Sequence, residues 1–503
     1  SVRTTVSLDG PIADGGVKGL VVPVDAQMNA AGAVRLAGEC TPLRWTSLKI
    51  SSLSLDPARL NLCGIGKDAL SLRSVQLAGR IGESPLRLSA ASARYLIAPA
   101  RFDLAGLDAR IGAGENPVLM SAASLDGALD RKGGFAGKLT GASAVIGPVP
   151  LNLTEIAGAW RFANGKLGLD GALRVTDRQA VARFNPMMVP DAHLMLANSR
   201  IDVTGTLAHE KRKANVATLK IRHELGSGTG QADFALADLR FGTAIQPDDL
   251  TPMALGVVAN VNGLVEGKGQ IRWTGQGVTS TGTFSTRDMS LAAAFGPVTG
   301  LATTIEFTDL LGMKTAPHQR VTMKQVSAGV DVFDGVLDYA LLSNEQARVE
   351  GGRWPFSGGT LELLPATVEL DARKPRHFIF RLVGLDAGAF INTLQLENIS
   401  ATGTFDGLFP MIFDERGGRI EGGVLVARQQ GHAPLIMSSA NETLPLCDPN
   451  LQSGNLAYVG PVSNAQLGVM GKLAFDALKN LRYKCLTIFL DGALDGEFVT
   501  RVS

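Results

Sequence analysis

The stretch Leu125-Asp126-Gly127-Ala128-Leu129 recurs along this chain and decides the expected fold. Identical copies stand at residues 169–173 and 490–494, and looser copies at 333–337 and 405–409. Gly accepts positive φ and Asp hydrogen-bonds to nearby backbone, so an Asp-Gly pair between apolar residues predicts a turn or a β-bulge. Its return across hundreds of residues predicts a stacked β structure, in which each strand–turn unit covers the apolar face of its neighbour.

Alternation of apolar and polar residues is the dominant pattern elsewhere. In residues 199–207, Ile201 and Val203 share one face and Asp202 takes the other. One apolar face and one wet face are typical of antiparallel sheets. If about half of the residues form strands of about eight, about 30 strands spaced by about 4.8 Å make a sheet about 140 Å long. We therefore expect a single elongated body over residues 1–503.

Helices are expected at only two places. Residues 386–396 bring Phe390 and Ile391 together, and residues 464–483 bring Val469, Leu473 and Leu481 onto one face. An amphipathic helix of the second kind plugs or caps a sheet, although partner binding is an alternative. The chain ends in alternating sequence at residues 498–502. The strand at residues 485–490, or the one after it, is therefore expected to be an open sheet edge that can accept a partner strand.

The composition leaves apolar surface to be covered. Charged residues are 19 % of the 503 residues, against about 25 % on average, and the mean hydropathy is +0.14. This surplus requires a core, a partner or a ligand groove. The 48 basic and 47 acidic residues balance, so no overall field favours nucleic acid. The densest basic run, Lys211 to Lys213, is interpreted as a solvated loop. No stretch approaches the roughly 20 apolar residues that span a bilayer.

The four cysteines fall into two local pairs. The spacing favours disulfides Cys40–Cys63 and Cys447–Cys485 among the three possible connectivities. Two such bridges indicate an oxidising compartment, whereas four buried free thiols remain the alternative. There is no C-x-x-C motif, so a zinc site is not expected.

Motifs for catalysis are missing from the sequence. The histidines form neither H-x-H nor H-E-x-x-H, so a metal site has no support. The glycine-rich residues 226–230 lack a following Lys-Ser/Thr, and there is no G-x-S-x-G nucleophile elbow. We therefore expect neither an enzyme nor a bound cofactor.

Three phrases in the last two hundred residues resemble a known family. They are residues 349–359, residues 399–407 leading to 417–423, and residues 470–478. Together they look like the C-terminal part of YdbH-type proteins, relatives of the AsmA-like proteins of Gram-negative envelopes. The likeness is specific over residues 295–503. Before residue 295 only the general character of the sequence is similar.

The resemblance implies a fold and a function. Such proteins are anchored in the inner membrane by an N-terminal helix, which would lie outside this chain, and extend through the periplasm. Their curled antiparallel sheet forms a long apolar groove, and they carry phospholipids between the inner and outer membranes. A YnbE-type outer-membrane lipoprotein extends the sheet, and a YdbL-type periplasmic protein assists. An older label for the family is dicarboxylate transport. The family offers no catalytic residues.

The apolar members of the alternating strands are the candidates for lining the groove. Period 2 sends them to one face, although an ordinary core has the same pattern. They are Ile201, Val203, Ile305, Phe307, Leu361, Leu363, Val368, Leu370, Phe378, Phe380, Ile420, Val424, Leu486 and Ile488.

Two other functions compete with a lipid conduit. One is a structural or adhesive β-solenoid whose apolar faces are packed shut, which would favour shorter and more regular repeats than these. The other is a glycan-active enzyme, which the 4 Trp and 4 Tyr residues disfavour because they leave few rings to stack on sugars.

Overall fold

The structure is a computed structural model that contains two compact units. It describes residues 2–12, 15–28, 34–36, 40–50, 52–65, 69–97, 99–113, 117–129, 134–147, 149–293, 295–328, 330–371, 373–393, 395, 397–414, 417–439, 444, 447–458, 479–494 and 498–503. The first unit comprises Ser1–Leu239, Asp249–Pro252 and Gly267–Thr281. The second unit comprises Arg240–Asp248, Met253–Glu266 and Gly282–Ser503.

Strands make up most of the described chain. Up to residue 241 they are β1 Val2–Ile12, β2 Gly15–Met28, β3 Val34–Leu36, β4 Thr41–Trp45, β5 Ser47–Ile50, β6 Leu53–Leu55, β7 Ala58–Ile65, β8 Ala69–Ile81, β9 Ser84–Leu96, β10 Arg101–Ile111, β11 Val118–Leu129, β12 Phe135–Ile146, β13 Leu151–Ala163, β14 Lys166–Asp177, β15 Met187–Ala197, β16 Arg200–His209, β17 Asn215–Glu224 and β18 Thr229–Phe241. From residue 258 they are β19 Val258–Thr274, β20 Gly277–Ala293, β21 Gly296–Asp309, β22 Lys314–Thr315, β23 Gln319–Ala328, β24 Val330–Leu341, β25 Gln346–Phe356, β26 Gly359–Leu363, β27 Ala366–Glu369, β28 Arg376–Asp386, β29 Ile399–Thr402, β30 Thr404–Asp414, β31 Gly417–Arg428, β32 Gly454–Tyr458, β33 Leu481–Tyr483, β34 Thr487–Ala493 and β35 Phe498–Val502.

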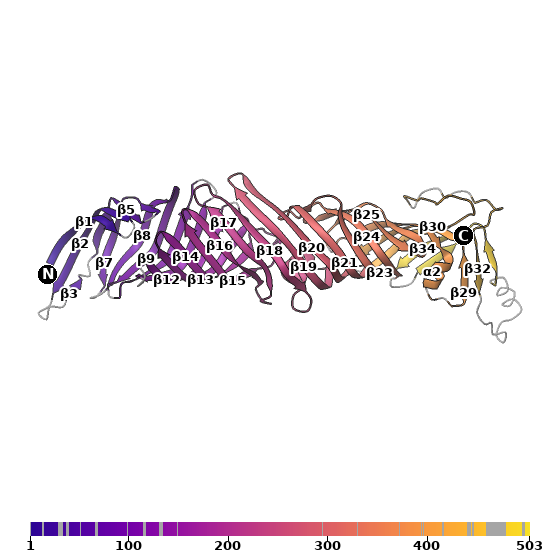
Figure 1. The fold of residues 1–503 in the computed structure, drawn as a ribbon, viewed down its shortest axis with the longest axis horizontal. Coiled ribbons are helices and arrows are strands. Elements are labelled where there is room, and N and C mark those ends of the chain that lie inside the picture. The colour runs from indigo at the N-terminus through magenta and orange to yellow at the C-terminus, as the bar shows by residue number, and fades with distance from the viewer. Residues whose placement is uncertain are drawn as a thin grey trace. The chain divides into compact units, whose positions relative to one another are not determined.

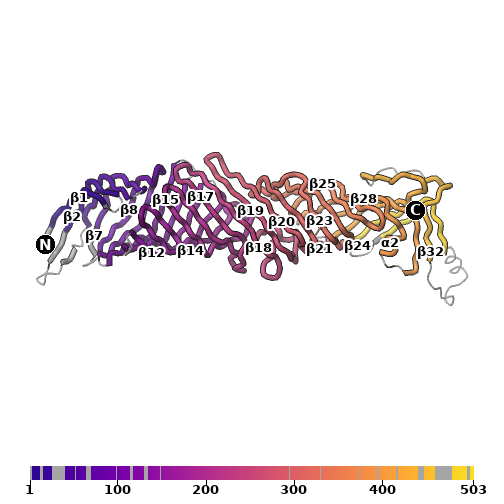
Figure 2. Tube along the Cα trace, in the orientation of Figure 1, coloured from indigo at the N-terminus to yellow at the C-terminus, as the bar shows by residue number. Residues whose placement is uncertain are grey.

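The expected mainly β, antiparallel fold is confirmed. Within each unit the strands pair with antiparallel neighbours, and Figure 1 shows them running side by side. Figure 2 traces the same meander along the Cα atoms. A separate small sheet in the second unit contains β29, β32 and β33.

The described helices are short. They are α1 Pro247–Leu250, the 3₁₀ turn η1 Pro252–Ala254 and α2 Ala387–Thr393. The helix expected over residues 386–396 is confirmed by α2, which begins where the Asp386 carboxylate accepts a hydrogen bond from the Ala389 N–H at 2.7 Å, as an N-cap does. Most of the helix expected over residues 464–483 falls on residues 459–478, outside the described ones. Its end is corrected, because Leu481–Tyr483 forms β33. Among the described helices, none is long and apolar enough to span a membrane.

The Asp-Gly pairs lie inside strands, so a turn is the wrong interpretation of them. They occur in β11, β14, β24, β30 and β34. Two of the aspartates accept a hydrogen bond from a glycine on the neighbouring strand, and each of these glycines has a left-handed backbone conformation. The Asp491 carboxylate accepts from the Gly422 N–H at 2.6 Å, and Asp406 accepts from the Gly384 N–H at 2.9 Å. A bulge frees one N–H from the ladder, and the aspartate satisfies it.

At two of the pairs the glycine makes room for a tryptophan ring. A Cβ at Gly127 would lie 2.6 Å from the Trp160 ring, and a Cβ at Gly335 would lie 2.0 Å from the Trp354 Nε1. The Trp160 indole N–H in turn donates to the Asp126 carbonyl at 2.9 Å. At these two copies the motif therefore couples an Asp on one face with an indole ring over Gly on the other.

In the first unit, turns at opposite ends of the strands meet. Successive turns of an antiparallel sheet lie alternately at the two ends of its strands. The β8–β9 turn and the β17–β18 turn therefore lie at opposite strand ends, with β10 to β16 between them. Nevertheless the Ser84 hydroxyl donates to the Leu225 carbonyl, and each residue is only 4 % exposed. The sheet of this unit therefore curls until turns from its two rows of strand ends touch.

The second unit shows the same closure. By the same reasoning, Phe295, at the turn before β21, and Phe413, at the far end of β30, lie at opposite strand ends. Their ring centroids lie 6.2 Å apart. This sheet also curls, and each unit thus has a concave side.

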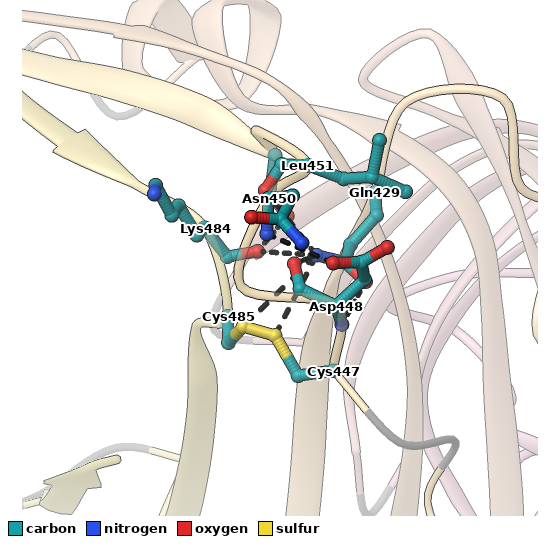
Figure 3. The surroundings of a disulfide bond; sticks show 8 residues. Gln429, Cys447, Asp448, Asn450, Leu451, Lys484 and Cys485 are labelled. Carbon is teal, nitrogen blue, oxygen red and sulfur yellow. Dashed lines mark hydrogen bonds between the residues drawn. A yellow bond between two sulfur atoms is a disulfide. The ribbon is translucent and has the colours of Figure 1, made fainter.

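Both expected disulfides are present. Cys40 is bonded to Cys63, and Cys447 is bonded to Cys485. The second bridge lies in a polar network, where the Gln429 amide donates to the Asp448 carbonyl at 2.7 Å and to the Lys484 carbonyl at 3.2 Å (Figure 3). This network fixes the chain after β31 against the strand that begins at Thr487.

Candidate functional site

An apolar row crosses the strands of the second unit. The ladders place Val321 opposite Leu337, and Leu363 opposite Phe380, with Gly352 linking the two pairs. Directly opposed residues of an antiparallel ladder share a face. We call the face that carries these residues the inner face.

The inner face is built mainly from aliphatic and aromatic side chains. Its buried members are Val298, Val321, Met323, Val326, Val332, Val349, Trp354 and Leu363. Half-buried residues such as Leu337, Tyr339, Phe378 and Phe380 pack against them. The strands alternate because each must present apolar side chains to this face and polar ones to water.

The opposite face is charged and paired. Arg320 contacts Asp338 at 2.8 Å, and Glu362 receives hydrogen bonds from both Arg353 and Arg381. The hydrogen bonds from Arg320 lower the pKa of Asp338. The sheet thus separates an apolar face from an ionic one.

Most of the predicted groove residues of the second unit share the inner face. In addition to Leu363 and Phe380, the ladders and clusters place there Ile305, Phe307, Leu361, Val368, Phe378, Ile420, Leu486 and Ile488. Leu370 directly follows β27 and lies outside the ladder. In the first unit, Ile201 and Val203 share a face opposite Asp202, with His223 and Ile221 as their ladder partners.

Val424 departs from the expected single face. The register of β31 shifts between Ile420 and Gly423, where Gly422 adopts a φ of +72°. One extra residue reverses the alternation, so Val424 lies opposite Leu408 on the other face. There Val424 is buried at 4 % exposure with Leu408 and Met437.

Residues 430–439, which we call the cover segment, explain why that face is apolar at β30, β31 and β34. Met437 of the segment is 1 % exposed and packs on Leu408 and Val424. The Leu435 N–H donates to the Asp406 carboxylate at 2.9 Å, and Asp406 is also paired with Arg428. The segment is thus held to the sheet by a buried carboxylate and by apolar contacts.

Buried polar groups in the first unit serve the fold. The Trp273 indole N–H donates to His223 Nδ1 at 3.1 Å, and burial lowers the pKa of His223, so the imidazole is an acceptor. At the end of β14, burial acts to raise the pKa of Asp177. The guanidinium and backbone N–H of Arg183 outweigh burial and bring the pKa to about 2. Among the described residues, no group of three or more His, Cys, Asp or Glu could hold a metal ion.

Within the described part of the chain, the last strand has one unpaired side. β35 pairs with β34 on one side, and no described strand pairs with its other side. Val499 and Val502 of β35 are 70 % and 62 % exposed. An exposed edge strand with apolar side chains is a template for an added strand.

Sequence reasoning missed much of the inner face. It does not single out Val321, Met323 or Leu337, although residues 319–324 alternate without a break. The cover segment carries no period at all, so its sequence offers no signal.

The comparisons with known proteins identify a family. The model described as "YdbH-like: Intermembrane phospholipid transport protein YdbH" matches residues 2–452 and 449–503. No curated protein matches the chain.

Proposed function

Because this chain belongs to the YdbH-like family of intermembrane phospholipid transport proteins, we propose that its inner face binds the acyl chains of phospholipids and lets them slide. The family is one of transport proteins, and the chain is not an enzyme. The observation that supports the proposal is the apolar row Val321, Leu337, Leu363 and Phe380, which crosses the strands of the second unit on one face of the sheet.

The physics of the inner face suits a conduit. Each CH₂ removed from water contributes about 0.8 kcal/mol wherever it lies on an apolar surface. A lipid that moves along the row exchanges one set of apolar contacts for an equivalent set, and no directional bond must break. The charged opposite face remains in contact with water.

The location and partners form the finer part of the proposal. The family acts between two membranes, so the chain belongs to the cell envelope, and two disulfides fit the oxidising periplasm. We place the full-length protein at the inner membrane through an anchor outside this chain. A YnbE-type lipoprotein would add a strand to the edge of β35, and a YdbL-type protein would assist. The chain would act as one body over residues 1–503.

Lipid analysis tests the proposal. The purified chain is extracted with organic solvent, and phospholipid is measured by mass spectrometry. We expect phospholipid to co-purify. A structural or adhesive β-solenoid with sealed faces would yield none.

A charge on the inner face sharpens the test. Phe380→Asp should reduce the bound lipid while the protein stays folded, because Phe380 is only half-buried. His377→Asp, on an exposed position of the same strand and the other face, is the matched control and should retain lipid. Equal lipid in both folded variants would contradict the proposal.

A further inference from the structure

A bridge of aromatic rings joins the two rows of strand ends in the second unit. Phe378 packs against the apolar cluster of the inner face. Its ring lies edge-to-face against Phe413, with the ring centroids 5.8 Å apart and the ring planes at 65°. Phe413 in turn lies edge-to-face against Phe295, at 6.2 Å and 77°. The three rings therefore run from the inner face at β28, over the end of β30, to the turn before β21.

The outer pair of rings connects parts of the sheet that no ladder connects directly. Phe295 and Phe413 lie at opposite strand ends, and the ladder between them runs through β21, β23, β24, β25, β26, β28 and β30. Their contact therefore closes the curled sheet from one row of strand ends to the other. We call the contact between Phe295 and Phe413 the seam.

A phospholipid on the concave side of this sheet has to keep its headgroup in water. The phosphate is charged, and moving an unpaired charge from water into an apolar interior is strongly unfavourable. The inner face offers mainly aliphatic and aromatic side chains. The headgroup must therefore project between the two rows of strand ends, and it cannot pass the seam while the rings touch.

The seam is a contact that can part without unfolding the sheet. Phe295 is 38 % exposed, whereas Phe413 is 5 % exposed. Phe295 lies in the turn between Ala293 and Gly296, outside the ladder that joins β20 to β21. Movement of the Phe295 ring into water would open the seam and leave Phe413 packed against Phe378, with every strand pairing kept.

We propose that the seam is a gate in the transport path, which Phe295 closes and which opens to let a phospholipid headgroup pass. This inference rests on the proposed function, because a gate requires lipid on the inner face. The gate acts on lipids with a charged headgroup. A diacylglycerol has no such headgroup and can pass beneath the closed rings. The same requirement applies at the contact between Ser84 and Leu225 in the first unit.

The rate of lipid exit tests the gate. The chain is loaded with phosphatidylglycerol or with diacylglycerol, each carrying the same fluorescent acyl chain, and is mixed in a stopped-flow instrument with excess phosphatidylglycerol vesicles. Phe295→Ala should speed the exit of phosphatidylglycerol by about threefold or more, the change expected on losing one aromatic pair, and should affect diacylglycerol less. The matched control is Phe333→Ala, at a 50 % exposed phenylalanine outside the seam, which should leave both rates unchanged.

A crosslink across the seam gives the opposite perturbation. Phe295→Cys with Phe413→Cys supplies two thiols that a short bis-maleimide can join, because the four native cysteines are paired in disulfides. The closed seam should halt the exit of phosphatidylglycerol and leave that of diacylglycerol nearly unchanged. Arg348→Cys with Thr367→Cys, directly opposite each other on neighbouring strands, is the control crosslink and should slow neither lipid.

Failure of the gate is distinguishable from failure of lipid binding. If the unaltered chain takes up no phospholipid, the proposed function fails and the gate fails with it. If phospholipid loads but its exit ignores both Phe295→Ala and the crosslink, or if the crosslink slows diacylglycerol equally, the gate is overturned while binding to the inner face stands. Phe413 is buried, so a melting curve checks that the double cysteine variant folds; if it does not, the Phe295→Ala rates decide.

Discussion

Removing the Asp406 carboxylate should destabilise the second unit strongly. Asp406 is 1 % exposed and accepts hydrogen bonds from the N–H groups of Gly384 and Leu435, each at 2.9 Å. It also pairs with Arg428, whose side chain is only 20 % exposed. Asp406→Ala leaves two N–H groups and one guanidinium without this partner.

The magnitude follows from these contacts. Breaking a buried ion pair from one side costs about 3–5 kcal/mol, and each buried N–H left unpaired costs about 1–3 kcal/mol. We expect a loss of at least about 5 kcal/mol in the free energy of unfolding. Asp491→Ala is the matched control, because Asp491 belongs to the same motif but is exposed, and its carboxylate accepts from the Gly422 N–H. Its loss should be about 1 kcal/mol.

Urea denaturation gives the two free energies, and hydrogen exchange gives a local readout. Exchange in the cover segment should accelerate in Asp406→Ala, since Leu435 loses its anchor. Adding Arg428→Met should recover part of the stability, because the unpaired charge is removed. The reasoning is refuted if Asp406→Ala costs no more than Asp491→Ala, or if the cover segment keeps its protection.

Acid should weaken the first unit through Asp177, whose pKa of about 2 lies below the ordinary 3.8. Its stabilisation, about 2 kcal/mol, is complete above about pH 4 and is lost as the pH falls toward 2; Asp177→Asn should remove this step from the melting temperature against pH, and a persisting step contradicts the assignment. Gly335→Ala places a Cβ 2.0 Å from the Trp354 Nε1 and should cost about 1–3 kcal/mol, whereas Gly10→Ala, with open space around it, should cost less; equal melting temperatures would refute the packing argument. Cys447→Ser opens a bridge between residues 38 apart and should cost about 4 kcal/mol; an unchanged free energy of unfolding under non-reducing conditions would contradict it.

The fold class followed from the sequence because alternation is local. A strand such as β23 shows its two faces in every second residue, and a helix such as α2 shows its cap and apolar residues within one turn. The cysteine pairs also followed, since the separation between the pairs left one natural pairing.

The reversal at Val424 did not follow, for a physical reason. Gly422 is one of many glycines, and only the ladder shows that it is the one in a bulge. The turn interpretation of the Asp-Gly pairs failed for the same reason, because their N–H partners lie on neighbouring strands.

Photo-crosslinking tests the central claim most directly. A photoreactive residue is placed at Leu337 or Phe380 on the inner face, and at Asp338 or Arg381, their neighbours on the opposite face. Cells are labelled with radioactive phosphate and irradiated, and the purified protein is assayed for labelled phospholipid. The account predicts lipid on the variants at Leu337 and Phe380 and none on the variants at Asp338 and Arg381. Labelling on both faces alike, or on neither, would contradict it.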